Sequence, residues 1–187
     1  PAVACKQQQA PQQRPLPMLE YKSRSSVRVI AQGLLKRSAS DETTVAQKVQ
    51  SDFLSACRAY EIFNNVKPDE DIIDKPVSVT ATKITADGFY AIYDMGREEC
   101  GLIDIELDAK GGTIVDIAVG EHLDDMRVRA AIGGRNFASR LITCDGKNHL
   151  THYTNRYAGR YVELHVTHLT GDMTIHYAGL LPSEYPI

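Results

Sequence analysis

The chain has 187 residues, of which 43% are hydrophobic and 24% charged, the ordinary composition of a globular protein. This length allows one domain with a sizeable core and excludes two full-sized domains. The net charge is -3 and no segment concentrates Lys or Arg, which argues against nucleic acid as a partner. No apolar stretch approaches the roughly 20 residues that a membrane-spanning helix needs.

The four cysteines are widely spaced and include no CxxC pair. This spacing argues against a zinc site and against a dense disulfide framework, so we predict no metal and no cofactor. The chain has neither an initiating Met nor an apolar leader. We therefore expect a piece of a longer protein and predict no cellular compartment for it.

The chain begins with a segment that has no apolar period. Residues 1–17 hold four prolines and five glutamines, which is typical of an extended tail or linker. Weak alternation of apolar and polar residues over 18–22 and 26–31 then predicts one or two edge strands.

One helix is predicted after these strands. From Val45 to Cys57 an apolar residue recurs at every fourth position, and Ser40 or Asp41 can cap the first turn. The pattern predicts an amphipathic helix over residues 42–59.

The rest of the chain alternates short β signals with turn residues. Ile103, Ile105 and Leu107, for example, alternate with acidic residues, as in a strand with one buried face. Eight such runs without intervening helices predict a mainly β fold, an antiparallel β-sandwich of jelly-roll, galactose-binding-like type with one short N-terminal helix. We expect Pro182 to stop the last strand, which gives a domain over 18–181 and an exit linker over 182–187. The expected strands cover 77–84, 89–95, 102–107, 113–119, 138–144, 150–153, 161–168 and 173–181.

The densest polar cluster lies in the segment 121–136, which we call the 121–136 loop. A carboxylate pair beside His or Arg is what a glycosidase needs, and Glu121 with Asp124 offers the one candidate pair for a self-sufficient hydrolase. These acids come from one strand end and its turn, however, and nothing in the sequence places a second carboxylate across a cleft. We therefore predict that Glu121 pairs with Arg129 or Arg135 and pins the loop onto the sandwich.

Metal ligands and nucleophiles receive little support. Asp116, Asp124 and Asp125 are hard oxygen ligands, but the spacing of a calcium loop is missing. His165 and His168 lie three positions apart on a predicted strand and so face opposite sides of it. The chain contains no GxSxG motif, and we predict no catalytic residue.

A sugar-binding surface is the main alternative that composition leaves open, because sugars stack on aromatic faces. Tyr153, Tyr157 and Tyr161 cluster late in the chain. Against this, the chain has no Trp and only 7% aromatic residues. We expect most of its tyrosines to pack in the core.

Several motifs in a fixed order resemble the β-sandwich region of bacterial α-L-rhamnosidases and related glycoside hydrolases. The family pattern runs approximately D-x-G-R-E…G, G-E-x-L, G-G-R-N-F-A-x-R and G-x-R-Y-v-E-l. A segment similar to R-P-I-P-M-L-E precedes the sandwich. The matching strings here are YDMGREECGLI at 93–103, GEHL at 120–123, GGRNFASR at 133–140, RYAGRYVELHV at 156–166 and RPLPMLE at 14–20.

The resemblance implies a multidomain enzyme in which β-sandwich domains precede a helical α/α barrel that carries the catalytic acids. No position of this chain matches the catalytic motif. The resemblance thus implies a non-catalytic accessory domain whose partner is its own C-terminal catalytic domain, with an autonomous carbohydrate-binding module for a rhamnose-containing glycan as the alternative. The residues expected to contact the partner domain or a sugar are Glu121, Arg135 and Asn136.

Overall fold

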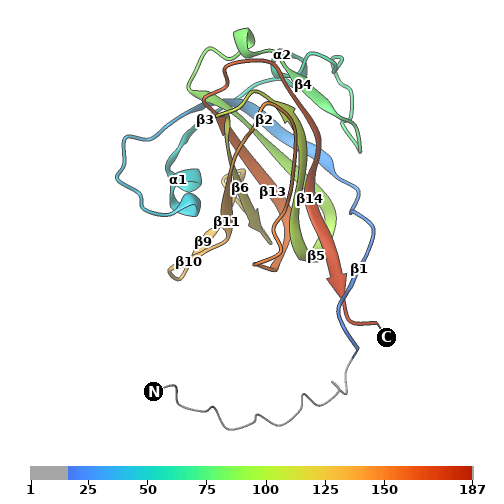
Figure 1. The fold of residues 1–187 in the computed structure, drawn as a ribbon. Helices are drawn as coiled ribbons and strands as arrows, with labels where there is room; N and C mark the ends of the chain where they lie inside the picture. Colours follow the sequence, from blue (N-terminus) through green and yellow to red (C-terminus); the bar gives the residue numbers. More distant parts are fainter. Residues whose placement is uncertain (1–16, 187) are drawn as a thin grey trace, which may run out of the picture.

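The computed structural model describes residues 17–186, so the predicted tail over 1–17 lies almost wholly outside the described part. The described chain is mainly β, with antiparallel strands and two short helices, which confirms the predicted fold class (Figure 1). No helix in residues 17–186 is both long enough and apolar enough to cross a membrane. The helices are α1 (Val45–Ser51) and α2 (Ala59–Ile62), and a short 3₁₀ turn covers Ala81–Lys83.

The strands form one large curled sheet and two small hairpins (Figure 1). The large sheet contains β1 (Glu20–Tyr21), β2 (Arg28–Lys36), β3 (Phe53–Ala56), β4 (Val77–Val79), β5 (Gly88–Ala109), β6 (Ile114–Gly120), β11 (Ala138–Ile142), β12 (Gly146–Thr151), β13 (Tyr157–Thr167) and β14 (Met173–Glu184). The hairpins pair β7 (Leu123–Asp124) with β8 (Arg127–Val128), and β9 (Ala131–Ile132) with β10 (Arg135–Asn136).

The long strand β5 links the two layers of the sandwich. Its first half, 88–94, pairs with β2 and β13, while its second half, 101–108, pairs with β14 and β12. Two separate strands were expected here, with a break at Gly96. Gly96 instead bulges the strand at a positive φ of 75°, and its N–H donates to Asp94 Oδ1 at 2.7 Å. The strand therefore bends from one layer into the other without ending.

The main core lies between the two layers. Ile103, Ile105 and Leu107 are completely buried in it, as their alternation predicts. The acids between them lie on the other face of the strand, where Glu106 is partly exposed but Asp104 is buried and bonds to Arg24 and His149. Strand β13 alternates in the same way: Val162 and Leu164 enter this core. We call the layer that contains β2, the first half of β5, β13, β6 and β11 the first layer. Its outer face carries a second, smaller core, which α1 and the 121–136 loop cover.

The predicted start of the first helix is wrong. The expected helix covers 42–59 and begins after Ser40 or Asp41, whereas α1 begins after Thr44. Thr44 Oγ1 accepts a hydrogen bond from the backbone N–H of Gln47, and the Gln47 side chain accepts one from the N–H of Thr44. This reciprocal capping box satisfies two N–H groups at one point of the chain, which fixes the first turn there.

The predicted end of the helix is also wrong. The chain leaves the helix at Asp52, whose carboxylate bonds to Arg37 and His165 and whose backbone is extended (φ -62°, ψ 148°). The next residues form β3, which pairs with β2. Phe53, expected on the buried helix face, is consequently 63% exposed. Tertiary contacts of a single carboxylate thus override the helical period.

Pro182 does not end the last strand, contrary to expectation. β14 continues to Glu184, because Pro182 lies opposite Gly101 and its carbonyl accepts a hydrogen bond from the N–H of Lys22. The following residue, Ser183, pairs with Tyr21 of β1. A proline is tolerated where the ladder needs its carbonyl but not an N–H.

The β7–β8 turn provides a test of backbone strain. Asp125 and Met126 both have positive φ, 49° and 57°, as a two-residue hairpin turn of this hand requires. The Met126 side chain is 54% exposed, so it gains little from burial. We predict that Met126→Gly raises the free energy of unfolding by about 0.5 to 1 kcal/mol, the relieved strain less the entropy that glycine loses. Met126→Ala, measured beside it by urea denaturation, keeps the strain and should give no gain. Equal stability of the two variants would contradict this account.

Candidate functional site

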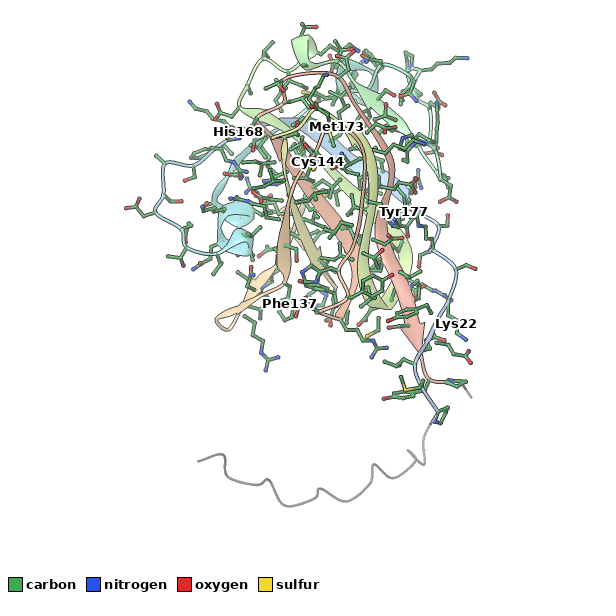
Figure 2. All side chains as sticks on the ribbon, in the orientation of Figure 1. Lys22, Phe137, Cys144, His168, Met173 and Tyr177 are labelled. Carbon is green, nitrogen blue, oxygen red and sulfur yellow. The ribbon has the colours of Figure 1, made fainter. Side chains whose placement is uncertain are left out.

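A pocket of about 540 Å³ opens where β6 ends and the β9–β10 hairpin begins to project. Phe137, at the lower end of the sheet in Figure 2, forms part of its wall. The hairpin contributes Ile132 and Gly133, and the start of β13 contributes Ala158. The polar side chains that line the pocket are Glu121, His122, Arg129 and Arg135.

The hairpin places these residues through its turn. Gly133 and Gly134 have positive φ of 55° and 77°, the conformation of a two-residue turn that favours glycine. The turn sets Arg135 directly opposite Ile132. The lip of the pocket therefore combines one cationic and one apolar side chain.

The structure brings two of the three predicted site residues together. Glu121 and Arg135 both line the pocket, but Asn136 does not. Asn136 Oδ1 instead accepts a hydrogen bond from the backbone N–H of Ala46 in α1 at 2.9 Å, and its Nδ2 donates to the carbonyl of Ala138 at 3.2 Å. Asn136 thus connects the loop to the helix, whereas the other two face the pocket.

The predicted ion pair of Glu121 with an arginine is wrong. The Glu121 carboxylate lies 4.0 Å from His122 Nε2, and neither Arg129 nor Arg135 comes within that distance in the described structure. All of these side chains are exposed, and an exposed ion pair contributes only about 0 to 1 kcal/mol, so little favours closing one. The loop is held by other contacts.

The base of the 121–136 loop is bonded to both ends of helix α1. Asn136 accepts from the N–H of Ala46 in the first turn. Arg127 Nη1 donates to the carbonyl of Gln50 at 2.9 Å and to that of Val49 at 3.4 Å in the last turn. Both contacts satisfy backbone groups that a helix end leaves unpaired, and the cation lies at the negative end of the helix dipole. A helix of seven residues gains its position largely from such contacts.

A buried ion network lies beneath α1 on the outer face of the first layer. His165 is completely buried; its Nδ1 lies 2.9 Å from Asp52 Oδ2 and its Nε2 lies 2.7 Å from Glu163 Oε1. The other oxygen of Glu163 accepts the N–H of Val128 in the loop at 2.7 Å. This chain of bonds joins the end of α1, strand β13 and the 121–136 loop.

Two arginines complete the network. Arg37 bridges Asp52 and Asp116 with contacts of 2.5 and 2.7 Å. Arg140 holds Asp116 through two donors, at 2.6 and 2.9 Å. Each buried carboxylate therefore has a cationic partner, as burial of charge requires.

The network shifts the pKa of two of its members. Burial alone lowers the pKa of His165, but its hydrogen bonds to Asp52 and Glu163 outweigh burial and hold the pKa above the ordinary 6.5. Burial alone raises the pKa of Asp52, but the bond to His165 and the charge of Arg37 outweigh it and hold the pKa below the ordinary 3.8. The imidazolium and the carboxylate therefore stabilise one another.

The three aspartates considered as calcium ligands do not lie together in the structure. Asp116 is fully buried between two arginines, so its oxygens are occupied. Asp124 and Asp125 lie exposed in the β7–β8 hairpin. Within residues 17–186 no three His, Cys, Asp or Glu side chains gather in a way that could hold a metal ion.

The sequence reasoning missed this network, although one signal was present. Glu163 and His165 alternate with Val162, Leu164 and Val166, so both polar residues lie on one face of an apolar strand. A carboxylate and an imidazole two positions apart on such a face predict a buried pair. The partner Asp52 lies more than a hundred residues away and carried no local signal.

A family model described as the bacterial alpha-L-rhamnosidase concanavalin-like domain matches residues 84–177. A solved GH78 family rhamnosidase of Bacillus sp. GL1 is 21% identical with a TM-score of 0.60, over 78% of this chain and 15% of that one. A rhamnosidase from Klebsiella oxytoca, solved with rhamnose bound, is 11% identical with a TM-score of 0.46, over 90% of this chain and 30% of that one. No curated protein matches the chain.

The curled sandwich and its covering loop define a concanavalin-like β domain. The chain belongs to the family of the bacterial alpha-L-rhamnosidase concanavalin-like domain, which confirms the resemblance drawn from the motifs. It spans only 15% of the Bacillus chain.

The raised pKa of His165 predicts a pH dependence of stability. Its contribution is fully present below pH 6.5, where the imidazole is protonated in both states, and it is lost as the pH rises through the higher pKa of the folded state. For Asp52 the pKa is lowered, so its contribution is present above 3.8 and is lost as the pH falls through the folded-state value. The free energy that the network contributes should therefore be greatest between about pH 4 and 6.5. Urea denaturation of wild type and His165→Gln across pH 4 to 9 measures it, and a stability gap that widens above pH 6.5 would contradict this assignment.

Breaking the network at its centre should be costly. His165→Gln removes the cation between two buried carboxylates, and we predict a loss of about 3 to 5 kcal/mol in the free energy of unfolding at pH 6. His176→Gln is the matched control: His176 also contacts a carboxylate, that of Asp108 at 2.7 Å, but at the surface, and should cost less than about 1 kcal/mol. Similar losses in the two variants, measured by urea denaturation, would show that the buried site has no special role.

Proposed function

We propose that the chain is a non-catalytic accessory β-sandwich domain of an α-L-rhamnosidase-like glycoside hydrolase, which packs against and supports a catalytic domain of the same polypeptide. Two findings support a domain of a larger enzyme: the family match and the small share of the Bacillus rhamnosidase that the chain spans. The proposal assigns chemistry to the partner domain and positioning to this one.

The proposal is carried by the 121–136 loop, whose base is hydrogen-bonded to the rest of the domain and whose tip is exposed. Arg127, Val128 and Asn136 tie the base of the 121–136 loop to α1 and to Glu163. The tip projects beyond the sheet as the β9–β10 hairpin (Figure 1). The Ile132 side chain on this hairpin is 42% exposed. Held loops with an exposed apolar tip suit contact with another domain, because little conformational entropy is lost on docking.

The position of the hairpin agrees with this role. In Figure 1 the β9–β10 hairpin and the end of β14 both lie toward the lower end of the molecule. A domain that follows β14 would therefore begin at this lower end, although the hairpin lies at its left in Figure 1 and the end of β14 at its right.

An autonomous carbohydrate-binding module is the second candidate. It is favoured by the pocket, whose volume of about 540 Å³ lies within the range of small-molecule sites, roughly 300 to 1,000 Å³. Titration of rhamnose into the purified chain separates the two candidates. Saturable shifts of pocket amides would favour the module, and unchanged spectra would favour the supporting role.

The supporting role predicts an effect of the hairpin tip on the multidomain enzyme. Ile132→Asp places a charge in the proposed contact, where an unpaired charge is costly to bury, and should lower the melting temperature of the enzyme relative to wild type. Ile142→Asp is the matched control, since Ile142 is also exposed but lies at the far end of β11. Differential scanning calorimetry makes the comparison, and identical melting of the two variants would overturn the contact.

Activity of the isolated chain gives an independent check. We expect no turnover of an aryl α-L-rhamnoside, because the pocket holds one carboxylate, Glu121, where hydrolysis of a glycoside uses two. Turnover that disappears in Glu121→Gln would contradict a non-catalytic role.

A further inference from the structure

Two arginines of the 121–136 loop differ from the other arginines in residues 17–186. Each of the others donates a side-chain hydrogen bond, to a carboxylate, a backbone carbonyl or a hydroxyl. Within the described chain the guanidinium groups of Arg129 and Arg135 have no hydrogen-bond or ion-pair partner. Both line the same pocket.

The pocket offers more than charge. Phe137 packs against both hydrophobic cores, and its backbone bonds to Ala130 and Val119 at 2.8 and 2.9 Å, so the aromatic wall is fixed in place. The Gly133–Gly134 turn fixes the strand that carries Arg135. Glu121, with no cation closer than 4.0 Å in the described structure, keeps acceptor oxygens for a ligand hydroxyl.

The local charge is opposite to that of the whole protein. Two arginines and one glutamate line the pocket, whereas the chain as a whole carries -3. The net negative charge of the protein repels anions, so an anion bound in this pocket would be held by Arg129 and Arg135. A guanidinium binds a carboxylate through two parallel hydrogen bonds, in a geometry that no neutral sugar matches.

We propose that this pocket binds an acidic sugar residue, a hexuronate, with its carboxylate on Arg129 and Arg135, its ring against Phe137 and a hydroxyl on Glu121. The proposal rests on the proposed function only in placing the chain within a glycan-degrading enzyme. It adds that the accessory domain selects polysaccharides that carry uronate units. The occupant is a sugar, because a simple inorganic anion has neither a ring to pack against Phe137 nor a carbon-bound hydroxyl to donate to Glu121.

The test is a titration of the ¹⁵N-labelled 187-residue chain followed by NMR. Sodium glucuronate, glucose and sodium sulfate are added separately while the amides of Gly133, Arg135 and Ala158 are monitored. We expect saturable shifts with glucuronate and none with glucose at the same concentration. Sulfate should bind much more weakly than glucuronate.

Two charge-matched variants assign the binding. Arg135→Gln should raise the Kd for glucuronate about tenfold, which corresponds to about 1.4 kcal/mol. Lys147→Gln removes the same charge from exposed strand β12, outside the pocket, and should change the Kd less than twofold. The spectrum of each variant reports that it is folded.

Four results would overturn the proposal: no shift with glucuronate, equal shifts with glucose, equal affinity for sulfate, or equal weakening by the two variants. The measurement uses the chain alone. Failure of the domain contact in the multidomain enzyme therefore leaves this result unaffected, and the two proposals can fail separately.

Discussion

The buried bonds of His165 to Asp52 and Glu163 connect the two segments that cover the outer face of the first layer, α1 and the 121–136 loop, to the sheet. Asp52 ends α1, and Glu163 holds the N–H of Val128 at the base of the 121–136 loop. Such a network adds little net stability compared with an apolar core, because taking the charges out of water offsets most of their attraction. The network instead favours one position of the helix and loop, because any other position would leave a buried charge without a partner.

The pocket follows from this arrangement. The helix and Glu163 hold the base of the loop, the loop positions the β9–β10 hairpin, and the hairpin carries Arg135 to the lip. The side chains of Arg127 and Asn136 at the base make hydrogen bonds to the protein, whereas within the described residues the guanidinium of Arg135 makes none. This division separates a part of the molecule that maintains the fold from a part available for contact with a domain or a sugar.

The sequence predicted the sandwich because alternation is a local signal. Ile103, Ile105 and Leu107 needed no distant information to be placed in the core. The start of the helix was missed although its signal is local, the capping box of Thr44 and Gln47, whereas distant partners decide where the helix ends. The helical period continued through Phe53, but the bonds of Asp52 to Arg37 and His165 ended the helix before it. Glu121 and Arg135 line one pocket without forming the predicted ion pair, and no local pattern in the sequence distinguishes these two arrangements.

Hydrogen exchange at the Val128 amide tests most directly whether the network holds the loop. This N–H is buried and its acceptor is the side chain of Glu163, so its protection reports the network rather than a backbone ladder. The account predicts protection close to that of the Leu164 amide in the centre of β13, and loss of that protection in His165→Gln with Leu164 still protected. Exchange of the Val128 amide at the rate of an exposed loop in the wild-type protein would contradict it.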